Sequence, residues 1–273
     1  MNKLLAFTVS LLFVGILSVP AALEGSATSS QIQVTILYDN YTSVDDVKSD
    51  WGFSCLVQGT EKTILFDAGT KAEIFSHNVD TLNIDLNEVD LVVISHEHGD
   101  HTGGLSRLYK DNPDVSVYYP RSFSAEFVQS VRKANAKPVP VDEPIEICKD
   151  VFLTGEMGRG IKEQSLILQT AEGLVVITGC SHPGIVEILE ETKKQQHHED
   201  IYMVFGGFHL MRHSDEAVED ILQRFKELGI KKCGATHCTG DHQIELFQRA
   251  FGPDFIPIGV GKVITLSKIP GQE

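Results

Sequence analysis

The sequence predicts a layered α/β protein in which strands and helices alternate and several strands pair as hairpins. Three observations support this class. Strand-like and helix-like segments follow one another from residue 28 onward, turns separate neighbouring strands, and no long linker or clear repeat interrupts the chain. The chain has 273 residues, of which 42% are hydrophobic, enough for one large core or two modest ones. We expect a single domain over residues 28–273.

Short runs of β-branched and apolar residues predict the strands. The first run ends at an Asp-Asn turn, and two later pairs of runs are separated by glycine-containing turns, as in antiparallel hairpins. The expected strands cover residues 32–38, 51–58, 62–66, 89–94, 165–170, 174–178, 201–205, 232–235 and 255–266.

Apolar residues at helical spacing predict the helices between these strands. One such pattern covers residues 123–131 and another covers residues 218–228. Ser214 is the expected N-cap of the second helix, and Gly229 is its expected end. A further helix is expected to run to about Lys194, with Pro183 in its first turn.

The first residues have the features of an export signal. Lys3 supplies a positive charge, residues 4–19 form an almost unbroken apolar run, and small residues follow. The run is shorter than the ~20 residues of a usual membrane span. We expect residues 1–27 to be a signal peptide that is cleaved near residues 21–27, leaving an exported protein, periplasmic or secreted, without a stable membrane span. An uncleaved N-terminal membrane anchor is the alternative.

The composition limits the partners and the covalent links. The net charge is −15, and no cluster of lysine and arginine offsets it, so nucleic acid is not an expected partner. The five cysteines are odd in number, and their spacing is not that of a small disulfide framework. At least one thiol must therefore stay unpaired within the chain.

The strongest chemical signal is the run His96-Glu97-His98-Gly99-Asp100-His101, directly after an apolar strand. Imidazole and carboxylate groups are ligands that divalent transition metals prefer. Alternation in an extended segment places His96 and His98 on the same side. The chain then turns, so Asp100 and His101 can face a second, neighbouring position. We expect one or two metals, with zinc as the first choice and iron or manganese as alternatives; two would lie ~3.5–4 Å apart with a bridging hydroxide.

This run resembles the signature of the metallo-β-lactamase superfamily, and Asp67-Ala68-Gly69 resembles its early D-x-G turn. The resemblance covers about residues 32–268 and implies a four-layered αβ/βα sandwich with the site at the edge of the two sheets. Further motifs resemble the dihydropteroate-synthase-like branch, named for an archaeal synthase that joins a dihydropterin-methyl group to a ribofuranosylaminobenzene 5′-phosphate. They are Thr154-Gly155-Glu156, Thr178-Gly179-Cys180-Ser181-His182, Gly206-Gly207-Phe208-His209-Leu210 and Thr236-His237-Cys238-Thr239-Gly240.

The later motifs supply further candidate ligands. We expect His182 to be the third histidine of the first metal position and His237 to bind the second metal. Many members of the superfamily have a bridging aspartate late in the chain, and no clear equivalent is present here. Cys180 is either its thiolate replacement or a buried structural thiol. His209 is a metal ligand, a proton donor or a substrate contact.

Other ionisable residues near these motifs receive supporting or surface roles. Asp67 is expected to accept the second ring N–H of a ligand histidine. Glu97 lies between two ligands and is expected to point away. The remaining histidines lack ligand spacing and are expected at the surface; they are His77, His197, His198, His213 and His242.

The site chemistry favours a hydrolase in which a metal-bound hydroxide attacks a small ester, lactone or phosphodiester. Asp100 and His209 are the expected catalytic residues, and the substrate is expected to be a small, anionic molecule. The alternative is the transferase of the resembled branch. The export signal counts against it, because dihydropterins are made in the cytoplasm. A non-catalytic metal protein and a di-iron redox protein are less favoured hypotheses, and the oligomeric state is left open.

Overall fold

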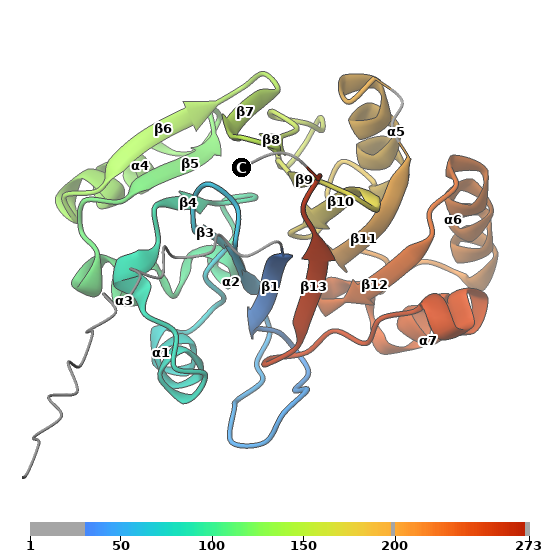
Figure 1. Ribbon diagram of the computed structural model, residues 1–273, viewed down its shortest axis with the longest axis horizontal. Helices are drawn as coiled ribbons and strands as arrows, with labels where there is room; N and C mark the ends of the chain where they lie inside the picture. Colours follow the sequence, from blue (N-terminus) through green and yellow to red (C-terminus); the bar gives the residue numbers. More distant parts are fainter. Residues whose placement is uncertain (1–30, 198–199, 271–273) are drawn as a thin grey trace, which may run out of the picture.

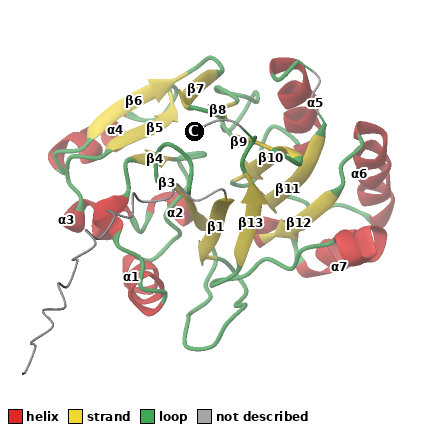
Figure 2. Cartoon of the chain, viewed as in Figure 1, coloured by secondary structure: helices red, strands yellow, loops and turns green. Residues whose placement is uncertain are grey.

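Two β-sheets lie face to face at the centre of the molecule, and helices cover their outer faces (Figure 1). The structure is a computed structural model that describes residues 31–197 and 200–270. Figure 2 shows the helices on either side of the paired sheets. This arrangement is the four-layered αβ/βα sandwich that the sequence resemblance implies. The expected signal peptide lies outside the described residues.

The first sheet has the strand order β13-β1-β2-β3-β4-β5-β6. Neighbours from β3 to β6 run parallel, and the pairs among β13, β1, β2 and β3 are antiparallel. Its strands are β1 (Gln31–Tyr38), β2 (Ser54–Gln58), β3 (Ile64–Phe66), β4 (Leu91–Val93), β5 (Ser116–Pro120), β6 (Lys137–Val141) and β13 (Val263–Ser267). The helices in this half are α1 (Ala72–Thr81), α2 (Gly99–Thr102), α3 (Leu105–Asp111) and α4 (Ala125–Lys133), with the 3-10 helix η1 (Leu86–Glu88).

The second sheet has the strand order β12-β11-β10-β9-β8-β7, in which β10, β11 and β12 are parallel. Its strands are β7 (Ile145–Cys148), β8 (Val151–Leu153), β9 (Leu166–Thr170), β10 (Gly173–Thr178), β11 (Ile201–Gly207) and β12 (Lys232–Thr236). The helices in this half are α5 (Ile185–Gln195), α6 (Asp215–Leu228) and α7 (Asp241–Phe251), with the 3-10 helices η2 (His237–Thr239) and η3 (Gly252–Asp254). Among the described residues, no helix has the length and apolar character needed to cross a membrane.

The core consists of apolar clusters between successive layers. Strand β4 shows how they are built, because adjacent side chains of a strand point to opposite faces. Val93 packs between the two sheets, together with Phe205 of the second sheet. Val92 packs against the outer helices, together with Phe75 of α1. A third cluster joins the second sheet to α5, α6 and α7, and Phe225 lies within it. Strands buried on both faces hold the loops at their ends in fixed positions.

Several expected elements are confirmed. The hairpin of β9 and β10 pairs antiparallel, with Thr170 opposite Gly173. Ser214 is the N-cap of α6, and its side chain accepts a hydrogen bond from the backbone N–H of Ala217. Gly229 ends that helix with φ +77°, the left-handed conformation that glycine adopts without strain.

Other element boundaries were wrong. Residues 51–53 precede β2 in an irregular segment, and residues 255–262 form no continuous strand before β13. Pro183 lies before its helix, because Gly184 is the N-cap of α5. Strand β6 was not expected, and it contains Pro138 and Pro140. Proline lacks a donor N–H, and β6 accommodates two prolines because it is an edge strand that pairs only with β5.

Candidate metal centre

The predicted site residues follow strands of both sheets. Strands β3 and β4 of the first sheet and β10, β11 and β12 of the second are each followed by a loop or short helix that carries one or more of them. Parallel strands bring their carboxyl ends to a common edge, where side chains from distant parts of the sequence meet. The residues carried there are Asp67, His96, His98, Asp100, His101, Cys180, His182, His209 and His237.

His96, His98 and His182 form the first donor group. Their candidate ligand atoms all lie within 4.8 Å of one another. The two nitrogens His96 Nε2 and His98 Nδ1 are 3.0 Å apart, so these side chains share one side as expected. The ring centroid of His182 is 4.7 Å from that of His96 and 4.9 Å from that of His98. The structure therefore assembles the first position as the sequence predicts.

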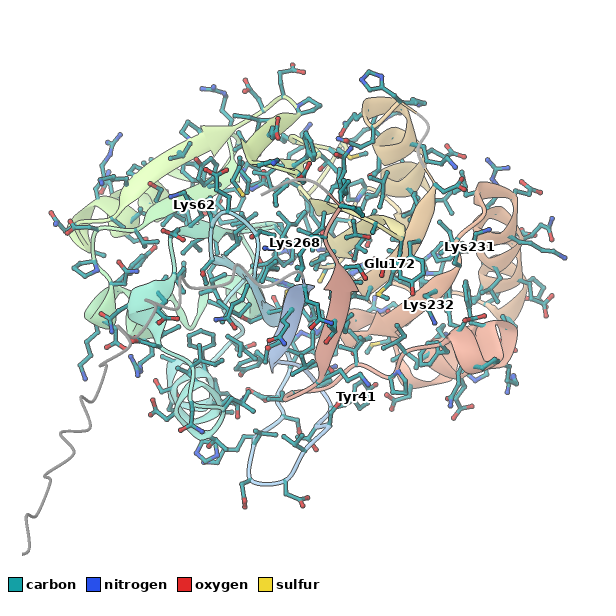
Figure 3. The ribbon with its side chains drawn as sticks, in the orientation of Figure 1. Tyr41, Lys62, Glu172, Lys231, Lys232 and Lys268 are labelled. Atoms are coloured by element: carbon teal, nitrogen blue, oxygen red, sulfur yellow. The ribbon has the colours of Figure 1, made fainter. Side chains whose placement is uncertain are left out.

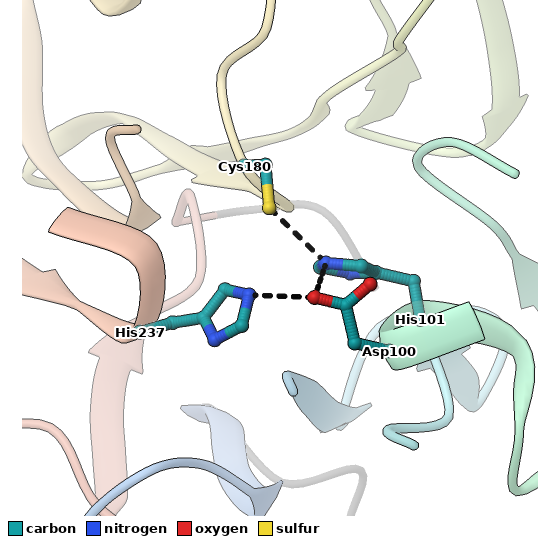
Figure 4. Close-up of side chains that lie close together, drawn as sticks. All are labelled: Asp100, His101, Cys180 and His237. Carbon is teal, nitrogen blue, oxygen red and sulfur yellow. Dashed lines mark hydrogen bonds and ion pairs between the residues drawn. The ribbon is translucent and has the colours of Figure 1, made fainter. Parts of the chain in front are cut away.

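Asp100, His101, Cys180 and His237 form the second donor group, also within 4.8 Å. Figure 4 shows Cys180 and His237 approaching Asp100 and His101 from different parts of the chain. His101 Nε2 is 3.2 Å from Cys180 Sγ and 3.7 Å from Asp100 Oδ2. His237 Nε2 is 3.4 Å from the same oxygen of Asp100. Cys180 also lies within 4.8 Å of candidate ligand atoms of His182 and His209, so its thiol is placed between the groups.

A single buried carboxylate orients two of the histidines. Asp67 Oδ2 is 2.6 Å from His101 Nδ1 and accepts the Ser95 hydroxyl at 2.7 Å. The Ser95 oxygen is in turn 2.9 Å from His96 Nδ1. These contacts occupy the Nδ1 atoms and leave the Nε2 atoms facing the donor groups. Such supporting bonds fix the tautomer and the ring orientation of metal-binding histidines, as expected for Asp67.

The ring nitrogens of His237 and His182 show whether the donor groups fit a metal. His237 Nδ1 is 3.0 Å from the side-chain oxygen of Asn40, which holds that ring as well. His237 Nε2 and His182 Nε2 are buried and have no hydrogen-bond partner among the described residues. A buried polar atom without a partner costs about 1–3 kcal/mol. Imidazole, carboxylate and thiol donors around such atoms fit divalent transition metals such as zinc.

Glu163 supports the same site and was missed by the sequence analysis. Its side chain is fully buried, with 1% exposure. Oε1 accepts the backbone N–H groups of Gly179, Cys180 and Ser181, and Oε2 accepts that of His182 at 2.8 Å. Burial raises the pKa of Glu163 to about 7, although these hydrogen bonds lower it. The carboxylate therefore fixes the loop that supplies a residue to each donor group, yet no motif marks it.

The histidines differ in their electrostatic environment. Burial lowers the pKa of His96 well below its usual value, and neighbouring histidines add to this effect. Burial likewise lowers the pKa of His182 to about 4, with His209 as the next cause. Burial also acts to lower the pKa of His101. The charge and the hydrogen bond of Asp67 have a larger effect and raise that pKa to about 9. Neutral imidazole is the form that binds metals, so the lowered pKa values of His96 and His182 favour coordination.

All five cysteines lie in the described part of the chain and are free thiols. Cys180 is buried, and the thiol of Cys238 is 3.6 Å from its backbone oxygen. Burial raises the pKa of the Cys180 thiol well above its usual value. The structure thus places the Cys180 thiol among the donors of the second group.

His209 lies at the rim of the cluster. Its side chain is exposed, and its ring centroid is 4.4 Å from that of His182. Its backbone has φ +55°, two residues after the end of β11. A side-chain hydrogen bond with Cys238 raises the pKa of His209. This position suits contact with substrate as well as coordination.

Residues expected outside the cluster are outside it. Glu97 points away, and its carboxylate accepts hydrogen bonds from the backbone and hydroxyl of Ser124 at the start of α4. His77 is half-buried, and its ring contacts the backbone of Asp46. His198 lies outside the described residues. The exposed histidines away from the cluster are His197, His213 and His242.

Comparison with known proteins agrees with this geometry. The sequence model described as the metallo-β-lactamase superfamily matches residues 52–215, more than half of the chain. The chain belongs to the metallo-β-lactamase superfamily. That match begins before β2 and ends at the start of α6, so it includes both donor groups except His237. Members of the superfamily typically bind divalent metals, consistent with the donors found here.

Individual relatives of this superfamily member include both a synthase and a hydrolase. The chain is 29% identical to the 7,8-dihydropterin-6-methyl-4-(β-D-ribofuranosyl)-aminobenzene-5′-phosphate synthase of Methanocaldococcus jannaschii, over 85% of this chain and 96% of the relative. It is 32% identical to a crystal structure of a metal-dependent hydrolase of the β-lactamase superfamily, with a TM-score of 0.74 over 87% of this chain and 100% of the other. The metallo-β-lactamase fold protein YhfI from Bacillus subtilis, 15% identical with a TM-score of 0.65, shares the fold.

Proposed function

We propose that this superfamily member is a metal-dependent hydrolase that acts on a small ester, lactone or phosphodiester. The observation that carries the proposal is the pair of adjacent donor groups, in which His182 Nε2 and His237 Nε2 are buried without a hydrogen-bond partner among the described residues. The similarity to a metal-dependent hydrolase over the whole length of that relative supports the same reaction class.

The chain's own residues have distinct roles in this proposal. His96, His98 and His182 hold the first ion, while Asp100, His101 and His237 hold the second, with the thiol of Cys180 beside both groups. When bound, divalent metals supply an activated water and an electrophile for the substrate oxygen. Asp67 and Glu163 keep the ligands in place. His209, exposed beside His182, contacts the substrate or transfers a proton to the leaving group.

Metal analysis followed by a substrate panel tests the proposal. Purified protein is loaded with zinc, iron or manganese, and hydrolysis of phosphodiesters, lactones and other small esters is measured. The expected result is metal-dependent turnover that is lost in Asp100→Ala and in His182→Ala, which remove donors from different groups. The matched control is His213→Ala, which removes an exposed histidine outside the donor groups. Metal-loaded protein without hydrolysis of any substrate contradicts the hydrolase proposal.

The second candidate function is transfer of a dihydropterin-methyl group to a ribofuranosylaminobenzene 5′-phosphate. Its support is the 29% identity to the synthase over 85% of this chain. An assay for condensation with both synthase substrates, run on the same metal-loaded preparation, separates the two functions. Condensation without hydrolysis favours the transferase, and hydrolysis without condensation favours the hydrolase.

Export of the mature protein and a small anionic substrate also remain proposals. The apolar run after Lys3 supports export, and the acidic net charge of −15 is the reason to exclude nucleic acid. Mass spectrometry of the exported protein is expected to find a new N-terminus near residues 21–27. An intact Met1 contradicts cleavage and favours an N-terminal anchor.

A further inference from the structure

A cavity of about 410 Å³ opens beside the second donor group. His237 forms part of its wall, so a molecule in the cavity is adjacent to the proposed metals. Trp51 and Met211 line it as well, from the segment before β2 and the segment before α6. Few large apolar side chains of the described residues remain exposed. Trp51, with an exposed fraction of 42%, and Met211, with 50%, are two of them.

The indole of Trp51 is held in place although much of it is exposed. Its Nε1–H donates to Asp100 Oδ2 at 2.7 Å, and its ring centroid is 4.8 Å from that of His237. The hydroxyl of Thr70 donates to the backbone oxygen of Trp51. One edge of the indole is therefore fixed to a donor residue. An aromatic surface that is already ordered loses little conformational entropy when a ligand stacks on it.

Most polar side chains of the cavity wall already have a partner within the protein. Both side-chain atoms of Asn40 contact His237, and the ring of His242 is 2.7 Å from Asp215 Oδ1. The carboxylate of Asp241 accepts the hydroxyl of Tyr41. Beside these groups the cavity offers a ligand one aromatic face, on Trp51, and one thioether, on Met211.

The described protein residues that line the cavity supply no lysine or arginine side chain. Asp241 contributes a carboxylate, and Asp100 is bonded to Trp51. Lys62 and Lys268 lie at the other end of the strands from Tyr41, which contacts Asp241 (Figure 3). An anionic group of the substrate is therefore expected to lie toward the metals of the donor groups, and the part of the molecule over Trp51 is expected to carry no negative charge.

We propose that this cavity binds an uncharged planar ring of the substrate, stacked on Trp51 with Met211 against it. Aromatic faces and thioethers are surfaces that favour planar rings over saturated rings of equal size. The reacting group of the same molecule then lies toward Asp100 and His237. The cavity thus selects the substrate by its non-reacting part, while the donor groups hold the metals. This inference rests on the proposed function, because it assigns the cavity to the substrate of that site.

Trp51 provides a direct readout, because it is the one tryptophan in the sequence. Metal-loaded protein is titrated with benzamide and with cyclohexanecarboxamide, which share size and neutrality but differ in planarity. The expected result is saturable quenching of tryptophan emission by benzamide, with about two- to tenfold weaker binding of cyclohexanecarboxamide.

Matched variants locate the binding. Met211→Ala is expected to weaken benzamide binding several-fold, and Ile145→Ala, which removes an exposed apolar side chain on the distant strand β7, is expected to leave it unchanged. Equal responses to the planar and saturated probes, no saturable quenching, or loss of binding in both variants overturns the inference. Quenching requires no turnover, so saturable quenching in a protein without hydrolase activity contradicts the proposed function alone. Hydrolysis without selective quenching contradicts the cavity assignment alone.

Discussion

Asp67 Oδ2 and His101 Nδ1 are 2.6 Å apart in the interior, where both side chains are fully buried. The same oxygen accepts the hydroxyl of Ser95, which contacts His96. One carboxylate therefore supports a histidine in each donor group. This relationship explains how an aspartate outside the donor groups can control both positions.

Asp67→Asn is expected to weaken metal binding by about 10- to 100-fold, because the amide cannot accept from both neighbours in the way the carboxylate does. Asparagine tolerates the positive φ of +55° at this position, so the change isolates the hydrogen bonds from backbone strain. Metal affinity is measured by competition with a chelator. Asp220→Asn, at an exposed position on α6, is the control. Equal affinities of the two variants would show that Asp67 does not orient the ligands.

Substitutions of Glu163 are expected to be graded. Glu163→Gln keeps an oxygen that can accept the Gly179, Cys180 and Ser181 N–H groups but loses the acceptor for His182. Glu163→Ala loses all four bonds and leaves buried donors without partners, at about 1–3 kcal/mol for each group left without any partner. Thermal unfolding with and without metal is expected to rank stability as wild type, Gln variant and Ala variant.

The control for this series is Glu219→Ala, which removes an exposed glutamate of α6. If Glu163→Ala is as stable as that control and binds metal equally well, the loop does not depend on Glu163.

Gly103→Ala is expected to destabilise the protein by about 1–3 kcal/mol through steric overlap. A Cβ at Gly103 would lie 1.7 Å from the backbone oxygen of Thr70, although φ of −64° is an ordinary value for alanine. The clash would displace α2, which carries Asp100. Gly160→Ala is the matched control, since no described heavy atom lies within 4 Å of its added Cβ. The two variants are compared by chemical denaturation, and equal midpoints contradict the predicted close approach.

Cys180 is expected to react slowly with a thiol reagent while metal is bound and faster after chelation. It is buried and belongs to a donor group, whereas Cys148 is only half-buried in β7 and far from the donors. Mass spectrometry of labelled peptides measures both sites in one experiment, with Cys148 as the internal control. Labelling of Cys180 that is fast and indifferent to chelation rules out ligation.

The sequence predicted the parts of the site that are local or carried by motifs. His96, His98, Asp100 and His101 lie within six positions of one another, so their spacing alone indicates a metal site. His237 and the others were placed by motif resemblance, and the structure brings them to the same edge.

Glu163 was not predictable in this way. Its partners begin sixteen residues later in the chain, and they are backbone N–H groups that leave no trace in residue type. The role of Trp51 was missed as well, because the sequence analysis assigned this residue to a strand. Its apolar character favours burial, whereas the indole N–H binds Asp100 at the cavity. Long-range contacts of this kind depend on how the two sheets pack.

Local sequence signals also predicted the start of α5 wrongly, as Pro183 shows. Proline at the first helical position is a frequent pattern, yet Gly184 with φ +105° is the N-cap here. The hydrogen bonds of Glu163 to the preceding loop hold the chain in that position, so the helix begins two residues later. A tertiary contact therefore decided a boundary that propensity alone predicted wrongly.

Metal content is the most direct measure of the central claim. After metal loading and removal of unbound ions, elemental analysis of folded wild-type protein is expected to find one or two divalent metal ions per chain. His98→Ala is expected to lose most of the metal of the first group, while His213→Ala retains the wild-type content. Folded, metal-loaded wild-type protein with well under one ion per chain, or an unchanged content in His98→Ala, contradicts the account.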